Sequence, residues 1–187
     1  MSRILVTGSA GLIGRKLVQS LKSSGSDVVE FDSVHETAHS SYGDILNKEH
    51  IAQKIRGCHG IVHLAALSRV IWGEKFPSLC QFVNQLGTKN LLDEALDLPQ
   101  KPWFLYASSR EVYGEQEILP VREEAKLAPL NVYAKTKVYA ENLVGKAGER
   151  GLPTSILRFS NVFGGVQDHK DRVIPAFCLG AFRRRIC

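Results

Sequence analysis

The chain has 187 residues, a formal net charge of +5 and 44% hydrophobic residues. This length and composition fit one globular domain with a single core, and they exclude a disordered, collagen-like or repeat protein. The positive charge is scattered apart from the run Arg183–Arg185. We interpret that run as a solvated basic tail, so nucleic acid is not an expected partner.

Neither a signal peptide nor a membrane-spanning apolar run is recognisable, which leads us to expect a cytoplasmic protein with no membrane partner. The cysteines are widely spaced and predict reduced thiols rather than a disulfide framework; they are Cys58, Cys80, Cys178 and Cys187. His59 and His63 are four residues apart but lie around an apolar segment typical of a buried strand. Side chains alternate between faces there, so no metal site is expected.

Short apolar runs alternate with segments of helical periodicity along the chain. The runs predict strands at Arg3–Thr7, Val28–Phe31, Ile61–Leu64, Trp103–Ala107 and Pro153–Phe159. The periodic segments predict helices at Leu12–Leu21, Lys48–Ile55, Leu79–Leu96 and Asn131–Ala147. This alternation predicts an α/β fold of the Rossmann type, a doubly wound parallel sheet with helices on both faces. Ligands of such sheets bind at the carboxyl ends of the strands.

A glycine-rich segment, TGSAGLIG (7–14), joins the first predicted strand to the first predicted helix. Gly8 suits a tight turn, Gly11 lets backbone approach a pyrophosphate, and Gly14 lets the helix pack closely on the strand. The amino end of the helix favours phosphate through its free amides and its dipole. The segment therefore predicts a dinucleotide site.

Asp32 ends the second predicted strand. A carboxylate there accepts hydrogen bonds from the adenosine ribose and repels a 2′-phosphate, which favours NAD over NADP. The alternative is an ordinary aspartate in a turn. Asp44 and Ile45 are weaker candidates for contacts with the adenine.

Tyr133 and Lys137 lie one helical turn apart, and Ser109 follows the fourth predicted strand. The lysine ammonium favours the tyrosine phenolate, which can then remove a proton from a substrate hydroxyl held by the serine. Each feature alone is commonly a helix face or a turn. Together, after a dinucleotide loop, they predict hydride transfer between a carbinol and a nicotinamide.

With these motifs the chain resembles the extended short-chain dehydrogenase/reductase family, in its nucleotide-sugar epimerase/dehydratase branch. The matching segments follow the family's order and are TGSAGLIG (7–14), GDI (43–45), HLAA (63–66), NQLGTKNLL (84–92), SSREVYG (108–114), YAKTK (133–137) and LRFSNVFG (157–164).

The resemblance implies NAD as cofactor and a nucleotide sugar, such as a UDP-sugar, as substrate. The implied cofactor contacts are Gly8, Gly11, Leu12, Ile13, Gly14, Asp32, Asp44, Ile45, Leu64, Ala65, Ala66, Asn84, Tyr133 and Lys137. The implied catalytic residues are Ser109, Tyr133 and Lys137, and the implied substrate contacts are Ser109 and Asn161.

Glu111 matches the position of a catalytic glutamate in sugar 4,6-dehydratases, but Arg110 stands where those enzymes usually carry an aspartate. We therefore favour 4-epimerisation over dehydration or reduction. Relative to the family the chain looks short. The expected parts are an NAD-binding domain over 1–165 and the start of a truncated substrate-binding region over 166–187. A non-catalytic NAD-binding remnant or sensor, and a homodimer formed through an exposed apolar patch, remain alternatives.

Overall fold

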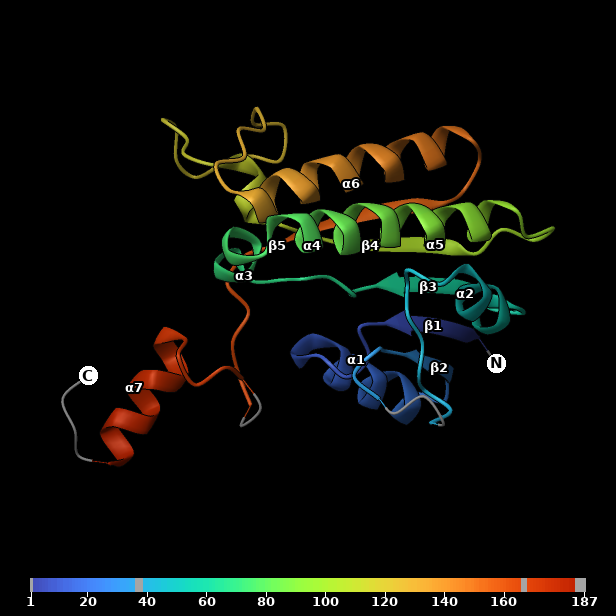
Figure 1. Cartoon of the computed structure of the whole chain (residues 1–187), viewed down its shortest axis with the longest axis horizontal. Helices are drawn as coiled ribbons and strands as arrows, with labels where there is room; N and C mark the ends of the chain where they lie inside the picture. The colour runs from blue at the N-terminus through green and yellow to red at the C-terminus, as the bar shows by residue number, and fades with distance from the viewer. Residues whose placement is uncertain (1, 36–38, 166–167, 184–187) are drawn as a thin grey trace.

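The computed structural model describes residues 2–35, 39–165 and 168–183. Three residues discussed above lie outside the described residues. They are Arg184 and Arg185 of the basic run, and the cysteine Cys187. One parallel five-stranded sheet runs through the molecule in the order β2-β1-β3-β4-β5 (Figure 1). The strands are β1 (Arg3–Thr7), β2 (Asp27–Phe31), β3 (Gly60–His63), β4 (Trp103–Ser109) and β5 (Thr154–Phe159). The order reverses between β1 and β3, where a doubly wound sheet binds its ligand.

The helices are α1 (Leu12–Ser23), α2 (Lys48–Ile55), α3 (Val70–Lys75), α4 (Pro77–Gln81), α5 (Gly87–Leu96), α6 (Val132–Glu149) and α7 (Val173–Phe182), with a π-helix, η1 (Phe82–Leu86), and a 3-10 helix, η2 (Arg110–Tyr113). Side chains that alternate along the strands divide the core into two clusters. Leu5, Ile61 and Phe104 pack in the larger cluster, together with residues of α2, α5 and α6. Ile4, Val6 and Val62 face the other way and meet α1. The predicted α/β fold is confirmed.

The helix predicted over Leu79–Leu96 differs from the prediction in one respect. It is three consecutive helical segments, α4, η1 and α5, and the first of them begins at Pro77. Proline suits this position because its missing N–H would have no partner at a helix start. The π-helical turn carries one extra residue, which shifts the periodicity and places Asn84 on the buried side.

Two α-helices, α3 and α7, and the short 3-10 helix η2 were not predicted. α3 follows β3 and contacts α6. α7 lies apart from the sheet in Figure 1, and large apolar residues such as Val173, Phe177 and Phe182 are exposed on it. Among the helices of the described residues, none combines the length and the apolar character needed to cross a membrane.

Candidate functional site

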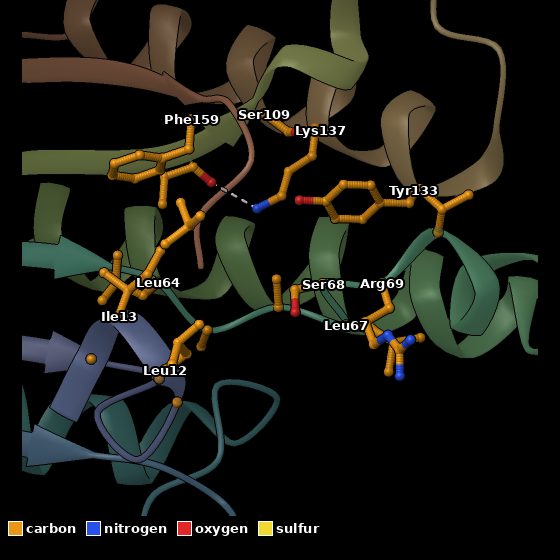
Figure 2. Close-up of a pocket in the computed structure, with 18 of the residues that line it drawn as sticks. Leu12, Ile13, Leu64, Leu67, Ser68, Arg69, Ser109, Tyr133, Lys137 and Phe159 are labelled. Atoms are coloured by element: carbon orange, nitrogen blue, oxygen red, sulfur yellow. Dashed lines mark hydrogen bonds between the residues drawn. The ribbon is translucent and has the colours of Figure 1, made fainter. Parts of the chain in front are cut away.

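A cavity of about 940 Å³ lies over the carboxyl ends of the strands, at the upper end of the usual range for small-molecule sites. All predicted site residues except Asn84 line it. The ones on the nucleotide side are Gly8, Gly11, Leu12, Ile13, Gly14, Asp32, Asp44, Ile45, Leu64, Ala65 and Ala66, and the ones on the opposite side are Ser109, Tyr133, Lys137 and Asn161. Figure 2 shows Leu12 and Ile13 facing the group formed by Tyr133 and Lys137 across this space.

The glycine loop is shaped by contacts that a side chain would destroy. Gly8 has φ +71°, and a Cβ there would lie 2.7 Å from the backbone nitrogen of Ala65. A Cβ at Gly14 would lie 2.1 Å from the carbonyl oxygen of Gly8. The loop consequently brings the amino end of α1 to the cavity, where the first amides have no partner within the helix. Free backbone amides of this kind can donate hydrogen bonds to a diphosphate. The first turn of α1 has no acidic residue that would repel it.

Asp32 is oriented by hydrogen bonds from two backbone amides, one of them in the glycine loop. Its Oδ2 accepts a hydrogen bond from Ala10 N at 2.9 Å, and its Oδ1 accepts one from Val34 N at 3.0 Å. A carboxylate oxygen accepts more than one hydrogen bond, so both oxygens retain capacity for ribose hydroxyls. Asp44 is likewise oriented by a bond from Leu46 N at 2.9 Å.

His63, at the end of β3, links β1 to α5 through hydrogen bonds to Thr7 and Thr88. Thr88 Oγ1 donates to Asn84 O at 2.7 Å, so the 2.9 Å contact between Thr88 Oγ1 and His63 Nε2 requires the imidazole to donate. His63 Nδ1 then accepts from Thr7 Oγ1 at 2.7 Å, and Thr7 Oγ1 accepts from Ala65 N at 3.2 Å. Burial, with a smaller contribution from the charge of Lys137, lowers the pKa of His63 to about 3, so the imidazole is neutral. Its role is structural, and no group of three potential metal-binding side chains occurs in the described parts of the chain.

Asn84 is not brought to the cavity, although the family resemblance implies a cofactor contact there. Its side chain is buried behind the wall, with Oδ1 accepting from Leu67 N at 2.8 Å. Its Nδ2 donates to Thr136 Oγ1 at 2.9 Å, and Thr136 Oγ1 donates to Tyr133 O at 2.7 Å. Asn84 thus links the segment after β3 to the turn of α6 that carries Tyr133.

Ser109, Tyr133 and Lys137 meet on the other side of the cavity. Asn131 caps α6 by accepting from Ala134 N at 2.8 Å, which fixes the start of the helix just before Tyr133. The Tyr133 hydroxyl points toward the Lys137 amine, which lies 5.7 Å from the Tyr133 ring centroid (Figure 2). Lys137 Nζ donates to Ala107 O at 2.7 Å.

Burial moves both proton-transfer groups away from their ordinary behaviour. It raises the pKa of Tyr133 to about 12, against a hydrogen bond from Ser109 that lowers it. It also lowers the pKa of Lys137 to about 8, against the charges of Cys80 and Glu141 that raise it. Such a pair of oppositely shifted groups in one cavity is typical of a catalytic site.

Several charged residues of the cavity were not assigned from the sequence. Arg69 lies at the start of α3 and donates to Asp171 Oδ2 at 2.6 Å, across 102 positions of the chain. Arg172 donates to Val162 O at 3.0 Å. The sequence gives no signal for these contacts, because both depend on where the segment before α7 lies. Glu111 also lines the cavity and accepts from Asn131 Nδ2 at 3.0 Å.

Comparison with known proteins agrees with this geometry. Residues 4–183 match the family described as the NAD dependent epimerase/dehydratase family. The chain belongs to that family. A 3-beta-hydroxysteroid dehydrogenase of Mycolicibacterium neoaurum is 33% identical over 88% of this chain and 48% of its own length. The low-salt glycan biosynthesis protein Agl12 of Haloferax volcanii is 37% identical over 93% of this chain and 61% of its own length.

Solved structures show the same fold. A UDP-glucose 4-epimerase of Thermotoga maritima with UDP-glucose has a TM-score of 0.88 at 25% identity, over 98% of this chain and 64% of that one. The dTDP-glucose 4,6-dehydratase DesIV of Streptomyces venezuelae, with NAD bound, has a TM-score of 0.85 at 28% identity, over 97% and 62%. The chain therefore spans about half to two thirds of the length of the relatives it matches.

Proposed function

We propose that the chain binds NAD and acts as a nucleotide-sugar 4-epimerase, exchanging hydride at the sugar C4 carbon through Ser109, Tyr133 and Lys137. The observation that carries the proposal is that these three residues share one cavity with the glycine loop and Asp32. The whole family is NAD-dependent by its description. The loop geometry fits the cofactor, because the glycines leave a cradle at the amino end of α1 that side chains would fill.

Within this site the glycine loop would hold the pyrophosphate and Asp32 the adenosine ribose. When bound, NAD would supply the hydride acceptor and donor and, when oxidised, a positive charge in the cavity. In the free site a hydrogen bond from Ser109 lowers the pKa of Tyr133, and with the sugar bound Ser109 would donate to the sugar hydroxyl oxygen instead and so orient it. The Tyr133 phenolate then removes the hydroxyl proton, and the Lys137 ammonium stabilises that phenolate. Asn161 would contact the phosphates of the nucleotide.

Burial makes Tyr133 a weaker acid in the free site, so the proposed mechanism needs a further positive charge to form the phenolate. With its pKa raised to about 12 by burial, Tyr133 is protonated at neutral pH. Lys137, with a pKa of about 8, is mostly an ammonium at pH 7. Catalysis by the phenolate consequently depends on the additional charge of the oxidised cofactor. We expect the rate to rise with pH up to about 8 and to stop rising above it, where Lys137 loses the proton that stabilises the phenolate.

A 4,6-dehydratase is the second candidate, because Glu111 lines the same cavity as Tyr133. Dehydration removes a proton at C5 as well as the hydroxyl at C6. Glu111 is a carboxylate within reach of this space, but its Oε2 is engaged by Asn131 and its Oε1 lies 3.6 Å from Arg110 Nη2. Both contacts engage the carboxylate oxygens that the elimination would need to take up the C5 proton, so epimerisation is proposed first.

The test is incubation of the purified chain with NAD and a panel of UDP- and dTDP-hexoses in D₂O, with products followed by NMR. Epimerisation gives the C4 epimer without deuterium at C5, whereas dehydration gives a 4-keto-6-deoxy product with solvent deuterium. Tyr133→Phe should retain NAD binding and lose at least ~100-fold in rate, as expected for removal of a general base. NAD binding without any turnover across the panel would refute the epimerase and support a non-catalytic NAD-binding protein.

A further inference from the structure

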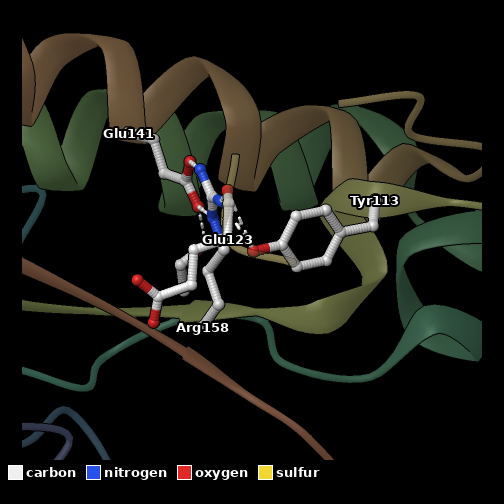
Figure 3. A network of polar contacts seen from close by, with 5 residues as sticks. Tyr113, Glu123, Glu141 and Arg158 are labelled. Carbon is white, nitrogen blue, oxygen red and sulfur yellow. Dashed lines mark hydrogen bonds and ion pairs between the residues drawn. The ribbon is translucent and has the colours of Figure 1, made fainter. Parts of the chain in front are cut away.

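A polar network behind the catalytic residues joins four parts of the chain (Figure 3). Arg158 of β5 forms a two-pronged ion pair with Glu141 of α6, with Nε to Oε1 at 3.0 Å and Nη2 to Oε2 at 2.8 Å. Arg158 Nη1 also donates to the Tyr113 hydroxyl at 2.7 Å and to Glu123 O at 2.9 Å. The Arg158 guanidinium therefore links β5 by hydrogen bonds to α6, to η2 and to the segment that follows η2.

The two charged groups are unequally exposed. The Glu141 side chain is 6% exposed and the Arg158 side chain 23% exposed. A buried carboxylate is costly without a partner, so removing one member of such a pair destabilises a protein. The planar guanidinium matches both carboxylate oxygens, which a lysine ammonium does not. The hydrogen bonds to Glu141 and to Tyr113 raise the pKa of Arg158, so the guanidinium stays charged.

The network reaches the catalytic residues at two points. Ser108 Oγ donates to Glu141 Oε1 at 2.5 Å, and Ser108 directly precedes Ser109 at the end of β4. Glu141 also follows Lys137 by four residues on α6, so their side chains lie on the same face of the helix. One carboxylate thus contacts the strand that carries the serine and neighbours the lysine.

Lys137 is surrounded by several other titratable groups. Tyr106 of β4 contacts it with its ring centroid 4.8 Å from Nζ, and Tyr133 does so at 5.7 Å. His63 of β3 is neutral, and the thiol of Cys80 in α4 has its pKa raised by burial. Glu141 is consequently the one carboxylate among the described groups that act on the pKa of Lys137.

From this geometry we infer that Glu141 and Arg158 are positioning residues for the proposed reaction, holding Ser109 in register with Tyr133 and keeping Lys137 in its ammonium form. The inference rests on the catalytic roles proposed above. Arg158 orients Glu141, and Glu141 acts through Ser108 on the end of β4 and through its charge on Lys137. Neither residue contacts the cavity.

The first experiment follows the titration of Lys137 by NMR of its ¹³Cε, in the full chain without ligand, with the signal assigned by its loss in Lys137→Met. Glu141→Gln keeps the size of the side chain and its bond from Ser108 but removes the charge. We expect the Lys137 midpoint to fall by about one pH unit, as for loss of an adjacent opposite charge. Asp93→Asn is the matched control, because it removes a carboxylate paired with Lys89 and Lys48 on the exposed surface and should leave the midpoint unchanged.

The second experiment uses Ser108→Ala, which leaves the ion pair intact and serves also if Glu141→Gln does not fold. Glu111 N donates to Ser109 Oγ at 3.2 Å. If Ser108 holds Ser109 in place, hydrogen exchange of the Glu111 amide should accelerate at least tenfold in this variant, while amides of β1 keep their rates. An unchanged Lys137 midpoint in Glu141→Gln or an unchanged Glu111 exchange rate in Ser108→Ala overturns the inference. Both readouts use the free chain, so their failure is distinguishable from failure to bind NAD or turn over a sugar.

Discussion

Lys137→Met should make the free chain more stable while it removes a residue of the proposed catalytic set. Burial lowers the pKa of Lys137 from 10.5 to about 8. At roughly 1.4 kcal/mol per pKa unit, holding the ammonium in this site costs about 3 kcal/mol of unfolding free energy at pH 7. Methionine avoids that cost but leaves Ala107 O without its donor, which offsets about 1 kcal/mol. The expected net gain is about 2 kcal/mol, or a rise in Tm of roughly 5 °C for a chain of this size.

The sign of the pH dependence follows from the direction of the shift. Because the pKa of Lys137 is lower in the folded chain, the unfolded chain binds more protons between pH 8 and 10.5, so wild-type stability rises with pH in that window. The advantage of Lys137→Met is therefore complete below pH 8 and declines as the pH approaches 10.5. Groups whose pKa does not depend on the charge of Lys137 cancel in the difference, whereas the pKa of the Cys80 thiol, which that charge lowers, does not.

Denaturant unfolding of wild type and Lys137→Met at pH 7, 8, 9 and 10 measures this difference. Lys135→Met is the control, because Lys135 lies on the exposed side of the same helix and carries no burial cost. A Lys137→Met chain that is less stable than wild type at pH 7, or an advantage that does not shrink with pH, would refute the reasoning.

Two further predictions concern the nucleotide side of the cavity. Asp32→Ala should weaken NAD binding and reduce the preference for NAD over NADP, measured as the rise in Tm that each cofactor produces; an unchanged preference would contradict the role of Asp32. Gly14→Ala should abolish the NAD-dependent rise in Tm, because its Cβ would lie 2.1 Å from the carbonyl oxygen of Gly8. Gly145→Ala, in open space on α6, is the matched control and should stabilise the chain by about 0.5–1 kcal/mol. Equal behaviour of the two alanine variants would show that close packing at Gly14 does not shape the loop.

The order of strands and helices was predictable because each strand is a short apolar run and each is followed by a recognisable helix or turn. The glycine loop, Asp32, and the spacing of Tyr133 and Lys137 were predictable for the same reason, since these signals are local. Strand ends were less so: β4 continues to Ser109, two residues beyond the predicted end, because its polar last residues still pair with β5. The two-domain boundary at 165 and the homodimer stay predictions.

What the sequence did not reveal depends on contacts between distant residues. Asn84, which the resemblance assigns to the cofactor, is buried in a π-helical turn and does not line the cavity, so that contact stays a prediction. A period of 3.6 residues does not detect such an insertion. Glu141 looked like any polar residue on a helix, since its partner Arg158 lies 17 positions away on another element.

The chain of hydrogen bonds through His63 gives the site two walls that respond differently to acidity. Each hydrogen bond in this chain has one direction. Ala65 N donates to Thr7 Oγ1, which donates to His63 Nδ1. His63 Nε2 donates to Thr88 Oγ1, which donates to the Asn84 carbonyl oxygen. A second proton on the imidazole would reverse the bond to Thr7, and with a pKa of about 3 the ring stays neutral at pH 5 and above. The hydrogen bonds that run through His63 therefore keep their directions between pH 5 and pH 9. Over the same range Lys137, in the opposite wall, changes its charge.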